Sequence, residues 1–571
     1  MSPGIKIAYF SMEVGIDPAI PTYSGGLGVL AGDLLRTAAD MKLSMAGITL
    51  LARKGYFNQK LDESGRQTEE PVIWQVEKHL QKLPNQVSVS IEGREVFLAA
   101  WQYLIKGPDD HEVPVYFLDA DLPQNSEWDR HLTDFLYGGD SRYRICQEVI
   151  LGMGGVRMLK ALGHAEIERY HMNEGHSAFL GLELLDETAA KKGKGPVGWD
   201  DVEEVRKKCV FTTHTPVPAG QDQFPMDLVY NVLGKHDVLE MEELFSFKGS
   251  LNMTYLALNL SHYVNGVGRR HGEISKLMFG GHTIDSISNG VHAGTWVSKP
   301  FQILFDRYIP DWREYNFSFR KAMSIPSNEV WTTHMEVKKR LIDRVKQDTG
   351  MILDPEVLTL GFARRAATYK RPDLIFTDIN RLKKAASTAG KFQMLFAGKA
   401  HPQDRPGKES IQSVFRAIHE LKSTIPIAYL PNYELELGQL MTSGADLWLN
   451  TPLSPMEASG TSGMKAALNG VPSLSVLDGW WVEGCVEGVT GWAIGEKPPL
   501  WGLGPDPGVS QENRAEEAEL LYEKLEKTIL PLYYGNRERF IRMMLHCIAL
   551  NGSFFNTQRM LMHYISRAYF S

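Results

Sequence analysis

The 571-residue sequence is poor in cysteine and lacks long apolar runs. The four cysteines stand singly and form no CxxC pair, so neither a disulfide framework nor a zinc site is expected; they are Cys146, Cys209, Cys485 and Cys547. No apolar run approaches the roughly 20 residues that span a bilayer, and no cationic leader precedes the apolar segment 5–10. We therefore expect a cytoplasmic protein that is neither secreted nor anchored in a membrane.

An excess of positive charge is also missing. The 61 Lys and Arg residues against 69 Asp and Glu residues give a net charge of −8, so no cationic field is available to hold a nucleic-acid backbone. The glycine turn 24–28 matches neither the GxGxxG nor a Walker pattern, and the histidines show no HExxH pattern and no accompanying GxSxG. The missing HExxH and GxSxG patterns disfavour metal and serine-hydrolase functions, and no metal site is expected.

The length and the distribution of apolar segments predict two α/β domains. A chain of 571 residues exceeds one ordinary core, since domains hold about 100–200 residues. In the second half, helical patterns separate the apolar runs 357–363, 392–397, 426–430, 447–450 and 474–477, and this alternation predicts a parallel, doubly wound sheet. Similar strand-like segments in the first half are 6–10, 45–51, 115–118 and 210–213.

We place the domain junction between about residues 290 and 355, which gives domains 1–320 and 321–571 and leaves open whether the last helix packs back on the first. One helix is expected to open at Ser327 and to stop at Gly350. Another is expected from Pro372 through Leu382, and a third from about Glu409. The Gly- and Pro-rich stretch 498–508 is typical of a surface loop.

The densest group of candidate functional residues is the stretch 457–465, which follows the apolar run ending at Asn450. Its glycines allow a ligand to approach the backbone, and the helix expected from about Gly463 favours an anion at its start. Hydroxyl donors come from Ser459, Thr461 and Ser462. Lys465 could hold a phosphate or bond to an aldehyde cofactor, although a Gly/Ser loop with a surface lysine is the plain alternative.

Three weaker signals accompany this stretch. The glycine turn 24–28 precedes an apolar helix and could approach an anion, although a plain turn is an equal reading. A basic cluster follows the strand 357–363 at the end where α/β ligand sites form; it comprises Arg364, Arg365, Lys370 and Arg371. Histidines in polar surroundings that could bind sugar hydroxyls are His176, His214 and His262. Each signal alone is compatible with a structural role.

In combination, these segments resemble the α-glucan phosphorylases of glycogen, starch or maltodextrin, in particular the short bacterial and archaeal forms. The matching segments lie in the same order along most of the chain: 11–13, 24–28, 173–176, 213–215, 262–267, 289–290, 364–371 and 457–465. The resemblance implies the GT-B glycosyltransferase fold, in which two doubly wound Rossmann-like domains face a cleft. It also implies reversible, retaining phosphorolysis of terminal α-1,4-linked glucosyl units by inorganic phosphate, giving glucose 1-phosphate.

The resemblance further implies pyridoxal 5′-phosphate, bound as a Schiff base to Lys465, whose phosphate group shuttles a proton. A phosphate with a second pKa near 6 suits proton exchange near neutral pH. The other cofactor-binding residues implied are Thr461, Ser462, Tyr433 and Arg364. Catalytic roles are implied for Lys370, Arg365 and His262. Substrate-binding roles are implied for Gly25, Gly26, Leu27, His262, Asn289, Glu457, Ala458, Ser459 and Gly460.

The sequence departs from the long forms of the family at several positions. Arg364 stands where they usually have lysine, Ala367 where many have histidine, and Ser462-Gly463 where they have Gly-Asn. Trp480 and Trp481 replace small residues, and no room precedes Lys6 for an N-terminal regulatory extension. The expected partners are the glucan, phosphate and glucose 1-phosphate, without nucleic acid or membrane; a homodimer is left open.

Two other functions stay open at this point. A nucleotide-sugar-dependent glucan synthase shares the two-domain architecture, but it would need neither a pyridoxal-binding Lys465 nor a second phosphate site at Arg365 and Lys370. A catalytically silent carbohydrate-binding protein could keep the fold and the motifs. Turnover of glucan and phosphate to glucose 1-phosphate separates the phosphorylase from both.

Overall fold

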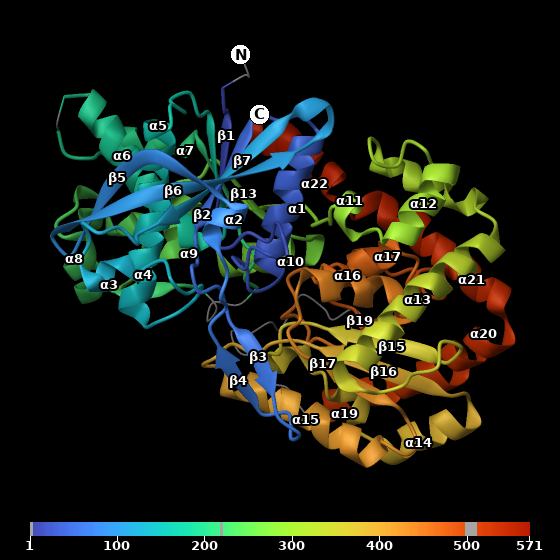
Figure 1. Ribbon diagram of the computed structural model, residues 1–571. Helices are drawn as coiled ribbons and strands as arrows, with labels where there is room; N and C mark the ends of the chain where they lie inside the picture. Colours follow the sequence, from blue (N-terminus) through green and yellow to red (C-terminus); the bar gives the residue numbers. More distant parts are fainter. Residues whose placement is uncertain (1–3, 194, 217–220, 497–510, 571) are drawn as a thin grey trace. The chain divides into compact units, whose positions relative to one another are not determined.

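Two sheets built mainly from parallel strands dominate the computed structural model, which describes residues 4–193, 195–216, 221–496 and 511–570 (Figure 1). The contacts within the chain divide it into two compact units. The first comprises Met1–Phe57, Pro71–Ile287 and Leu561–Ser571, and the second comprises Asn58–Glu70 and Ser288–Met560. In the middle of the chain, the boundary between the two units falls between Ile287 and Ser288. The domain boundary at residue 320 stays a prediction. The predicted loop 498–508 lies outside the described residues.

The first unit is built on a nine-stranded sheet in the order β14-β13-β9-β8-β1-β2-β7-β6-β5. Its strands are β1 (Ile7–Ser11), β2 (Met45–Leu50), β5 (Gln81–Ile91), β6 (Arg94–Lys106), β7 (Glu112–Asp119), β8 (Arg169–Asn173), β9 (Cys209–Thr212), β13 (Tyr263–Gly266) and β14 (Asp285–Ser286). The strands from β14 to β7 run parallel, and β6 and β5 add an antiparallel edge. Parallel strands buried on both faces read as continuous apolar runs, which is why the sequence revealed them.

The helices of the first unit follow and separate these strands. They are α1 (Gly26–Asp40), α2 (Val76–His79), α3 (Glu127–Arg130), α4 (Ser141–Val149), α5 (Gly155–Ala161), α6 (Leu180–Lys191), α7 (Trp199–Arg206), α8 (Met226–Leu233), α9 (Met253–Asn259) and α10 (Arg269–Met278). A small sheet joins β10 (Gln223–Pro225), β11 (Ser246–Phe247) and β12 (Ser250–Asn252). The core is a continuous apolar cluster between the large sheet and these helices, with Phe10, Leu118 and Phe179 fully buried.

The second unit contains six parallel strands in the order β17-β16-β15-β18-β19-β20. They are β15 (Leu358–Ala363), β16 (Phe392–Ala397), β17 (Ile427–Leu430), β18 (Leu447–Asn450), β19 (Ser473–Val476) and β20 (Gly491–Ile494). A separate hairpin, β3 (Asn58–Leu61) and β4 (Gln67–Glu70), belongs to this unit although it comes from the start of the chain. The predicted α/β class with parallel sheets is confirmed.

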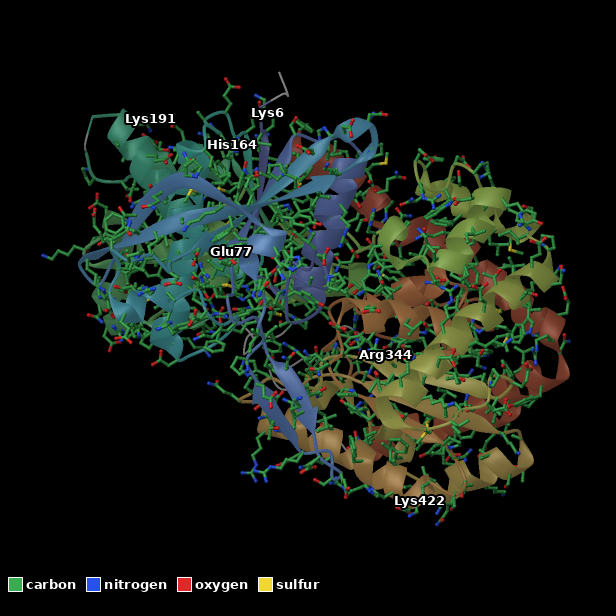
Figure 2. All side chains as sticks on the ribbon, in the orientation of Figure 1. Lys6, Glu77, His164, Lys191, Arg344 and Lys422 are labelled. Atoms are coloured by element: carbon green, nitrogen blue, oxygen red, sulfur yellow. The ribbon has the colours of Figure 1, made fainter. Side chains whose placement is uncertain are left out.

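Helices cover both faces of the six-stranded sheet. Figure 1 shows α16 (Leu435–Gly444) and α17 (Ser462–Leu468) on one face, and α14 (Ile379–Thr388), α15 (Arg405–Leu421) and α19 (Gln511–Lys524) on the other. The remaining helices are α11 (Ala293–Trp296), α12 (Lys299–Tyr308), α13 (Ser327–Thr349), α18 (Trp481–Gly484), α20 (Leu530–Gly535), α21 (Arg537–His546) and α22 (Thr557–Tyr564). In Figure 2 the labelled Lys422 lies at the periphery of this unit, just past α15. Across the described ranges, every helix is too short or too polar to cross a membrane.

The predicted helix bounds agree with the structure in one case and differ in two. Helix α13 spans Ser327–Thr349, and the predicted stop residue Gly350 caps it in the left-handed conformation at φ +72°. Helix α15 contains the predicted apolar face but starts four residues before the predicted Glu409, at Arg405, where Asp404 caps it. The single helix expected after Pro372 is two elements, a short 3₁₀ turn over Leu374–Phe376 and then α14.

The last residues of the chain anchor to the centre of the first sheet. The Tyr569 hydroxyl lies 2.7 Å from His171 Nδ1, and Thr212 Oγ1 lies 2.8 Å from His171 Nε2. All three side chains are buried, and burial lowers the pKa of His171 to about 3, so the ring is neutral near pH 7. A neutral imidazole has one donor and one acceptor, and here both are used.

Tyr569→Phe is therefore expected to destabilise the protein by about 1–2 kcal/mol, because it leaves one buried imidazole nitrogen without a partner. Urea-induced unfolding measures the change. Tyr230→Phe is the matched control, since Tyr230 is 45% exposed. Equal midpoints for the wild type and Tyr569→Phe would show that this hydrogen bond adds no stability.

Candidate active site

The residues predicted to bind phosphate lie where the order of the six strands reverses. Strands β15 and β18 are neighbours in space, yet β16 and β17 separate them along the chain. Arg364 follows β15 directly, and the stretch 451–461 follows β18. In doubly wound sheets the crevice at the carboxyl ends of such strands is the usual ligand site. The fold thus brings the basic cluster and the glycine-rich stretch to one point.

A buried ionic cluster occupies this point. Glu457 Oε2 accepts hydrogen bonds at 2.5 Å from Arg364 Nη2 and at 2.5 Å from Lys370 Nζ. All three side chains are buried. Burial alone would raise the pKa of Glu457, but Arg364 and Lys370 outweigh that effect and lower it to about 2. Near pH 7 one carboxylate therefore faces two cations, and the cluster carries a net positive charge.

Backbone contacts hold Arg364 and the glycine-rich stretch together. The Arg364 N–H donates to Ala397 O at 3.1 Å. Gly398 has φ +153°, and a side chain there would meet Arg364 O at 1.9 Å. Gly460 has φ +82°, and a Cβ added to it would lie 3.3 Å from Arg364 Nη2. Glycine at these two positions lets the neighbouring segments approach the arginine closely.

Lys465 is a buried amine in contact with an aromatic ring. It lies in α17, and its Nζ is 3.7 Å from the ring centroid of Trp296. Asn469 Nδ2 donates to Trp296 O at 2.8 Å and to Lys465 O at 3.0 Å, which ties the two residues to each other. The sequence does not single out Trp296, because one tryptophan forms no recognisable pattern.

The other predicted cofactor and sugar residues surround this helix start. Thr461 caps α17, and its carbonyl accepts the Lys465 N–H at 3.2 Å. The Ser462 hydroxyl accepts a hydrogen bond from Trp448 Nε1 at 3.1 Å, so one of its acceptor positions is already used within the protein. Ser459 Oγ is buried without a hydrogen-bond partner among the residues described. Ala458 lies between Glu457 and Ser459 on the same segment.

Tyr433 and Asn289 belong to the second unit and lie on two other loops. Tyr433 follows β17; burial raises the pKa of its phenol to about 12, and Arg364 acts against that rise. Asn289 is buried, and its carbonyl accepts a hydrogen bond from Arg559 Nη2 at 3.0 Å. Its side-chain Oδ1 has no hydrogen-bond partner in the described part of the chain. The Tyr433 ring packs against the apolar core of the second unit, whereas the Asn289 Oδ1 atom is left to a ligand.

The basic cluster separates into residues with different environments. Arg364 and Lys370 are buried on Glu457, whereas Arg365 is exposed. Arg371 faces away from this cluster. Its Nε donates to Thr451 O at 2.9 Å and its Nη1 pairs with Glu517 at 2.5 Å. Arg371, the fourth residue of the basic cluster, thus holds the segment after β18.

Two departures from the long forms of the family compensate each other in space. A Cβ added to Gly463 would lie 2.6 Å from Trp480 Cζ2, so the indole fills the place of any side chain at 463. Trp480 is buried, and it contacts Phe555 edge-on at 5.0 Å between ring centroids. A side chain at position 463 would therefore require a smaller residue at position 480.

In the first unit, the glycine turn sits on a buried carboxylate. Glu13 Oε2 accepts the Ser24 N–H at 2.5 Å and the Gly25 N–H at 3.1 Å, and Oε1 accepts the Tyr137 hydroxyl at 2.9 Å. The Gly25 amide, predicted to face the substrate phosphate, is therefore already engaged. Gly26 and Leu27 begin α1, and the first amides of a helix lack partners within it. The amides of this turn that have no partner within the helix are those of Gly26 and Leu27.

The structure does not support the predicted role of His262. Parallel α/β sheets bind ligands at the carboxyl ends of their strands, and His262 precedes β13 at the amino end. Its Nδ1 lies 2.8 Å from Cys209 O and its Nε2 lies 3.1 Å from Ala568 O, so both ring nitrogens contact backbone carbonyls. Polar neighbours in the sequence do not show at which end of a strand a histidine lies.

His214 lies at the ligand-binding edge instead. It follows β9, where its N–H donates to Glu174 Oε2 at 2.8 Å and its Nε2 lies 2.6 Å from Asn173 Oδ1. Burial lowers the pKa of His214 to about 3, with smaller effects from neighbouring histidines, so the ring is neutral. Glu174 adopts φ +77°, an uncommon conformation for glutamate that turns the chain at the end of β8. His214 is the histidine that the fold places for contact with a neutral polar ligand.

Comparisons with known proteins agree with this arrangement. Residues 237–490 match the family model described as carbohydrate phosphorylase. The chain is 38% identical to maltodextrin phosphorylase of Thermococcus litoralis, over 99% of its own length and 70% of that protein. It is 34% identical to glycogen phosphorylase of Aquifex aeolicus, over 99% of this chain and 86% of that protein. An uncharacterized protein of Methanocaldococcus jannaschii is 30% identical over 98% of this chain and 99% of its own.

The chain belongs to the carbohydrate phosphorylase family. It is an enzyme of the glycosyltransferase type, and the family resemblance drawn from its separated motifs is confirmed.

Proposed function

We propose that the protein is an α-glucan phosphorylase that transfers terminal α-1,4-linked glucosyl units to inorganic phosphate, releasing glucose 1-phosphate. The relatives named above are maltodextrin and glycogen phosphorylases, and they match over nearly the whole chain. The observation that carries the proposal is the convergence of buried Arg364, Lys370 and Glu457 with the glycine-rich stretch at the strand reversal. A synthase that uses nucleotide sugars has no need for the buried Lys465.

The residues around Lys465 fit pyridoxal 5′-phosphate, which we propose as the cofactor. Lys465 is a buried amine beside the flat face of Trp296. Arg364 supplies a fixed positive charge, Tyr433 and Thr461 supply hydroxyls, and Ser459 Oγ is a buried polar atom with no partner in the described ranges. When bound at Lys465, the cofactor would supply a phosphate group able to exchange a proton with the substrate phosphate. Arg364 would hold that group by a charge-assisted hydrogen bond.

Substrate phosphate would bind to Lys370, Arg365 and the amides of Gly26 and Leu27. Lys370 is fixed by Glu457, whereas Arg365 is exposed and can meet an incoming anion. Two phosphate groups repel each other, and the surrounding cations offset that repulsion. The net positive charge of the ionic cluster thus favours binding of the second anion.

Sugar hydroxyls would be held by neutral and acidic hydrogen-bonding groups. We propose Glu457, Ser459, Gly460 and Asn289 from the second unit, with the Ala458 backbone between them. For the histidine of this set we propose His214 in place of His262, because His214 lies at the carboxyl edge of its sheet. Buried hydroxyl and amide atoms such as Ser459 Oγ and Asn289 Oδ1, which have no hydrogen-bond partner among the described residues, favour a polar ligand that satisfies them.

In the reaction, an oxygen of inorganic phosphate bonds to C1 of the terminal glucosyl unit while the bond from C1 to the glucan oxygen breaks. The glucan oxygen leaves with the proton that the inorganic phosphate carried, so the products are glucose 1-phosphate and a glucan shorter by one unit. Lys370 and Arg365 orient the phosphate and stabilise its charge in the transition state. Configuration at C1 is proposed to be retained.

The finer fold class proposed with this function is the GT-B fold of two Rossmann-like domains facing a cleft. The strand order of the second sheet and the parallel strands of the first support it. Domains 1–320 and 321–571 and a cytoplasmic location remain our proposals, and a homodimer remains open.

The assay that tests the function incubates the purified protein with maltodextrin, inorganic phosphate and pyridoxal phosphate and measures glucose 1-phosphate. Release that depends on all three supports the proposal. A control with a nucleotide sugar in place of phosphate tests for glucan synthesis. Product from the nucleotide sugar alone would identify a synthase, and no product from either mixture, despite bound cofactor, would identify a silent binding protein.

A further inference from the structure

A second buried carboxylic acid lies beside Glu457 and takes no part in the site described so far. Asp478 follows β19, and its side chain is 2% exposed. Its Oδ2 accepts the Glu457 N–H at 2.8 Å. Its Oδ1 is buried and finds no hydrogen-bond partner within the described residues. A buried carboxylate oxygen without a donor is costly, whereas the protonated acid is tolerated.

Backbone contacts near Asp478 also hold the segment 457–459 in place. The Trp480 N–H donates to Ser459 O at 2.8 Å. Gly479 adopts φ +54°, and a Cβ there would lie 2.4 Å from Ser459 O. The segment 478–480 therefore holds the segment 457–459 at both ends, through the Asp478 side chain at one end and the Trp480 N–H at the other.

We infer that Asp478 is a positioning residue that holds Glu457 in place and, by gaining or losing a proton, sets how strongly the site binds a divalent anion. The inference rests on the proposed phosphate site. The protonated acid leaves the cluster of Arg364, Lys370 and Glu457 with its net positive charge. The ionised acid adds a negative charge next to Glu457 and weakens the attraction for phosphate.

The charges that act on Asp478 are consistent with a proton held near neutral pH. Burial raises the pKa of Asp478 to about 7, and the neighbouring Glu457 carboxylate adds to the rise. The Glu457 and Gly479 N–H groups and the Lys370 ammonium act in the opposite direction. Arg364 is paired with Glu457. Among the described residues, the charged groups that act most strongly on Asp478 are Glu457 and Lys370.

The experiment measures sulfate binding to the cofactor-loaded protein by calorimetry between pH 6 and pH 8.5. Sulfate keeps its charge across this range, so it reports on the site and not on its own ionisation. The wild type is expected to lose affinity about tenfold as the pH rises through 7, the effect of one added unit charge at short range. Asp478→Asn keeps the acceptor for the Glu457 N–H but cannot ionise, so it should show a flat profile.

Asp373→Asn is the matched control, because Asp373 belongs to the same unit but is 35% exposed and paired with Arg514. Its sulfate profile should follow the wild type. A wild-type profile that is flat, or one that Asp478→Asn reproduces in full, overturns the inference. The wild-type profile alone decides the case if Asp478→Asn fails to fold.

Stability gives a second readout. The folded-state pKa of Asp478 is raised above the unfolded value of about 3.8, so the wild type loses stability as the pH rises from about 4 to 7. The Asp478→Asn variant should therefore melt at a higher temperature than the wild type, and this difference should be larger at pH 8 than at pH 5. Sulfate binding and melting need no turnover, so their failure is distinguishable from a failure of the phosphorylase assay.

Discussion

Lys465→Ala is expected to abolish both the pyridoxal chromophore and the phosphorolysis of maltodextrin. Lys465 is the buried amine of α17, held against Trp296. Without it, the cofactor has no covalent attachment and its phosphate is not fixed near the substrate phosphate. We expect a loss of about 10²–10⁴-fold or more in rate, the usual size of a general acid–base contribution. Absorbance spectra before and after borohydride reduction, with mass mapping of the labelled peptide, measure the attachment.

A second lysine of the same unit makes this test stringent. Burial lowers the pKa of Lys399 to about 8, so Lys399 is the rival amine for an aldehyde. The sequence offered no signal for it, because the shift comes from burial after β16. Lys399→Ala should keep the chromophore and the label on Lys465. A label on Lys399, or an intact chromophore in Lys465→Ala, contradicts the assignment.

Glu457→Gln is expected to cost about 3 kcal/mol of stability and most of the activity. The substitution removes the carboxylate that contacts both Arg364 and Lys370, and it leaves two buried cations close together. Breaking a buried ion pair from one side costs about 3–5 kcal/mol because a buried charge loses its partner. Thermal unfolding and the phosphorolysis rate measure the two effects. Added phosphate should stabilise this variant more than the wild type, since the anion replaces the lost charge.

Glu487→Gln is the control for this substitution. Glu487 pairs with Lys524 at 2.5 Å, as closely as Glu457 with its partners, but the pair is 48% and 31% exposed. Exposed pairs contribute about 0–1 kcal/mol, so the control should melt near the wild type. If both variants lost the same stability, the buried ion pairs of Glu457 would contribute no more to folding than the exposed pair of Glu487.

The parallel strands of the second unit were the most predictable part of the fold. Runs 392–397 and 447–450 coincide with β16 and β18 because strands buried on both faces are apolar throughout. The segment after Pro372 was less predictable. Its apolar residues fit one continuous helical face, but the Asp378 side chain accepts the Arg381 N–H and starts α14 anew. Hydrophobic spacing cannot distinguish one long helix from two short elements that share a face.

The chemistry of the site was predictable where residues are adjacent in sequence. Glycines, hydroxyls and Lys465 in the stretch 457–465 indicated an anion site before any geometry was known. Residues that reach the site only through the fold gave no signal. Asp478 and Trp296 are single side chains whose positions depend on burial and on partners elsewhere in the chain. Glu13 lies in the matching segment 11–13, but its hydrogen bonds to the glycine turn are visible only in the structure. The roles of His262 and His214 stay predictions.

The interleaving of the two units affects how the protein is made. The hairpin of β3 and β4 is synthesised early yet belongs to the second unit, while the residues from Leu561 onward belong to the first. On the ribosome, the first unit therefore cannot become complete until residues 561–571 have been synthesised, because His171 and Thr212 form hydrogen bonds with the tyrosines of this segment. A gene cut near residue 288 would give two fragments, each lacking a segment of its own unit.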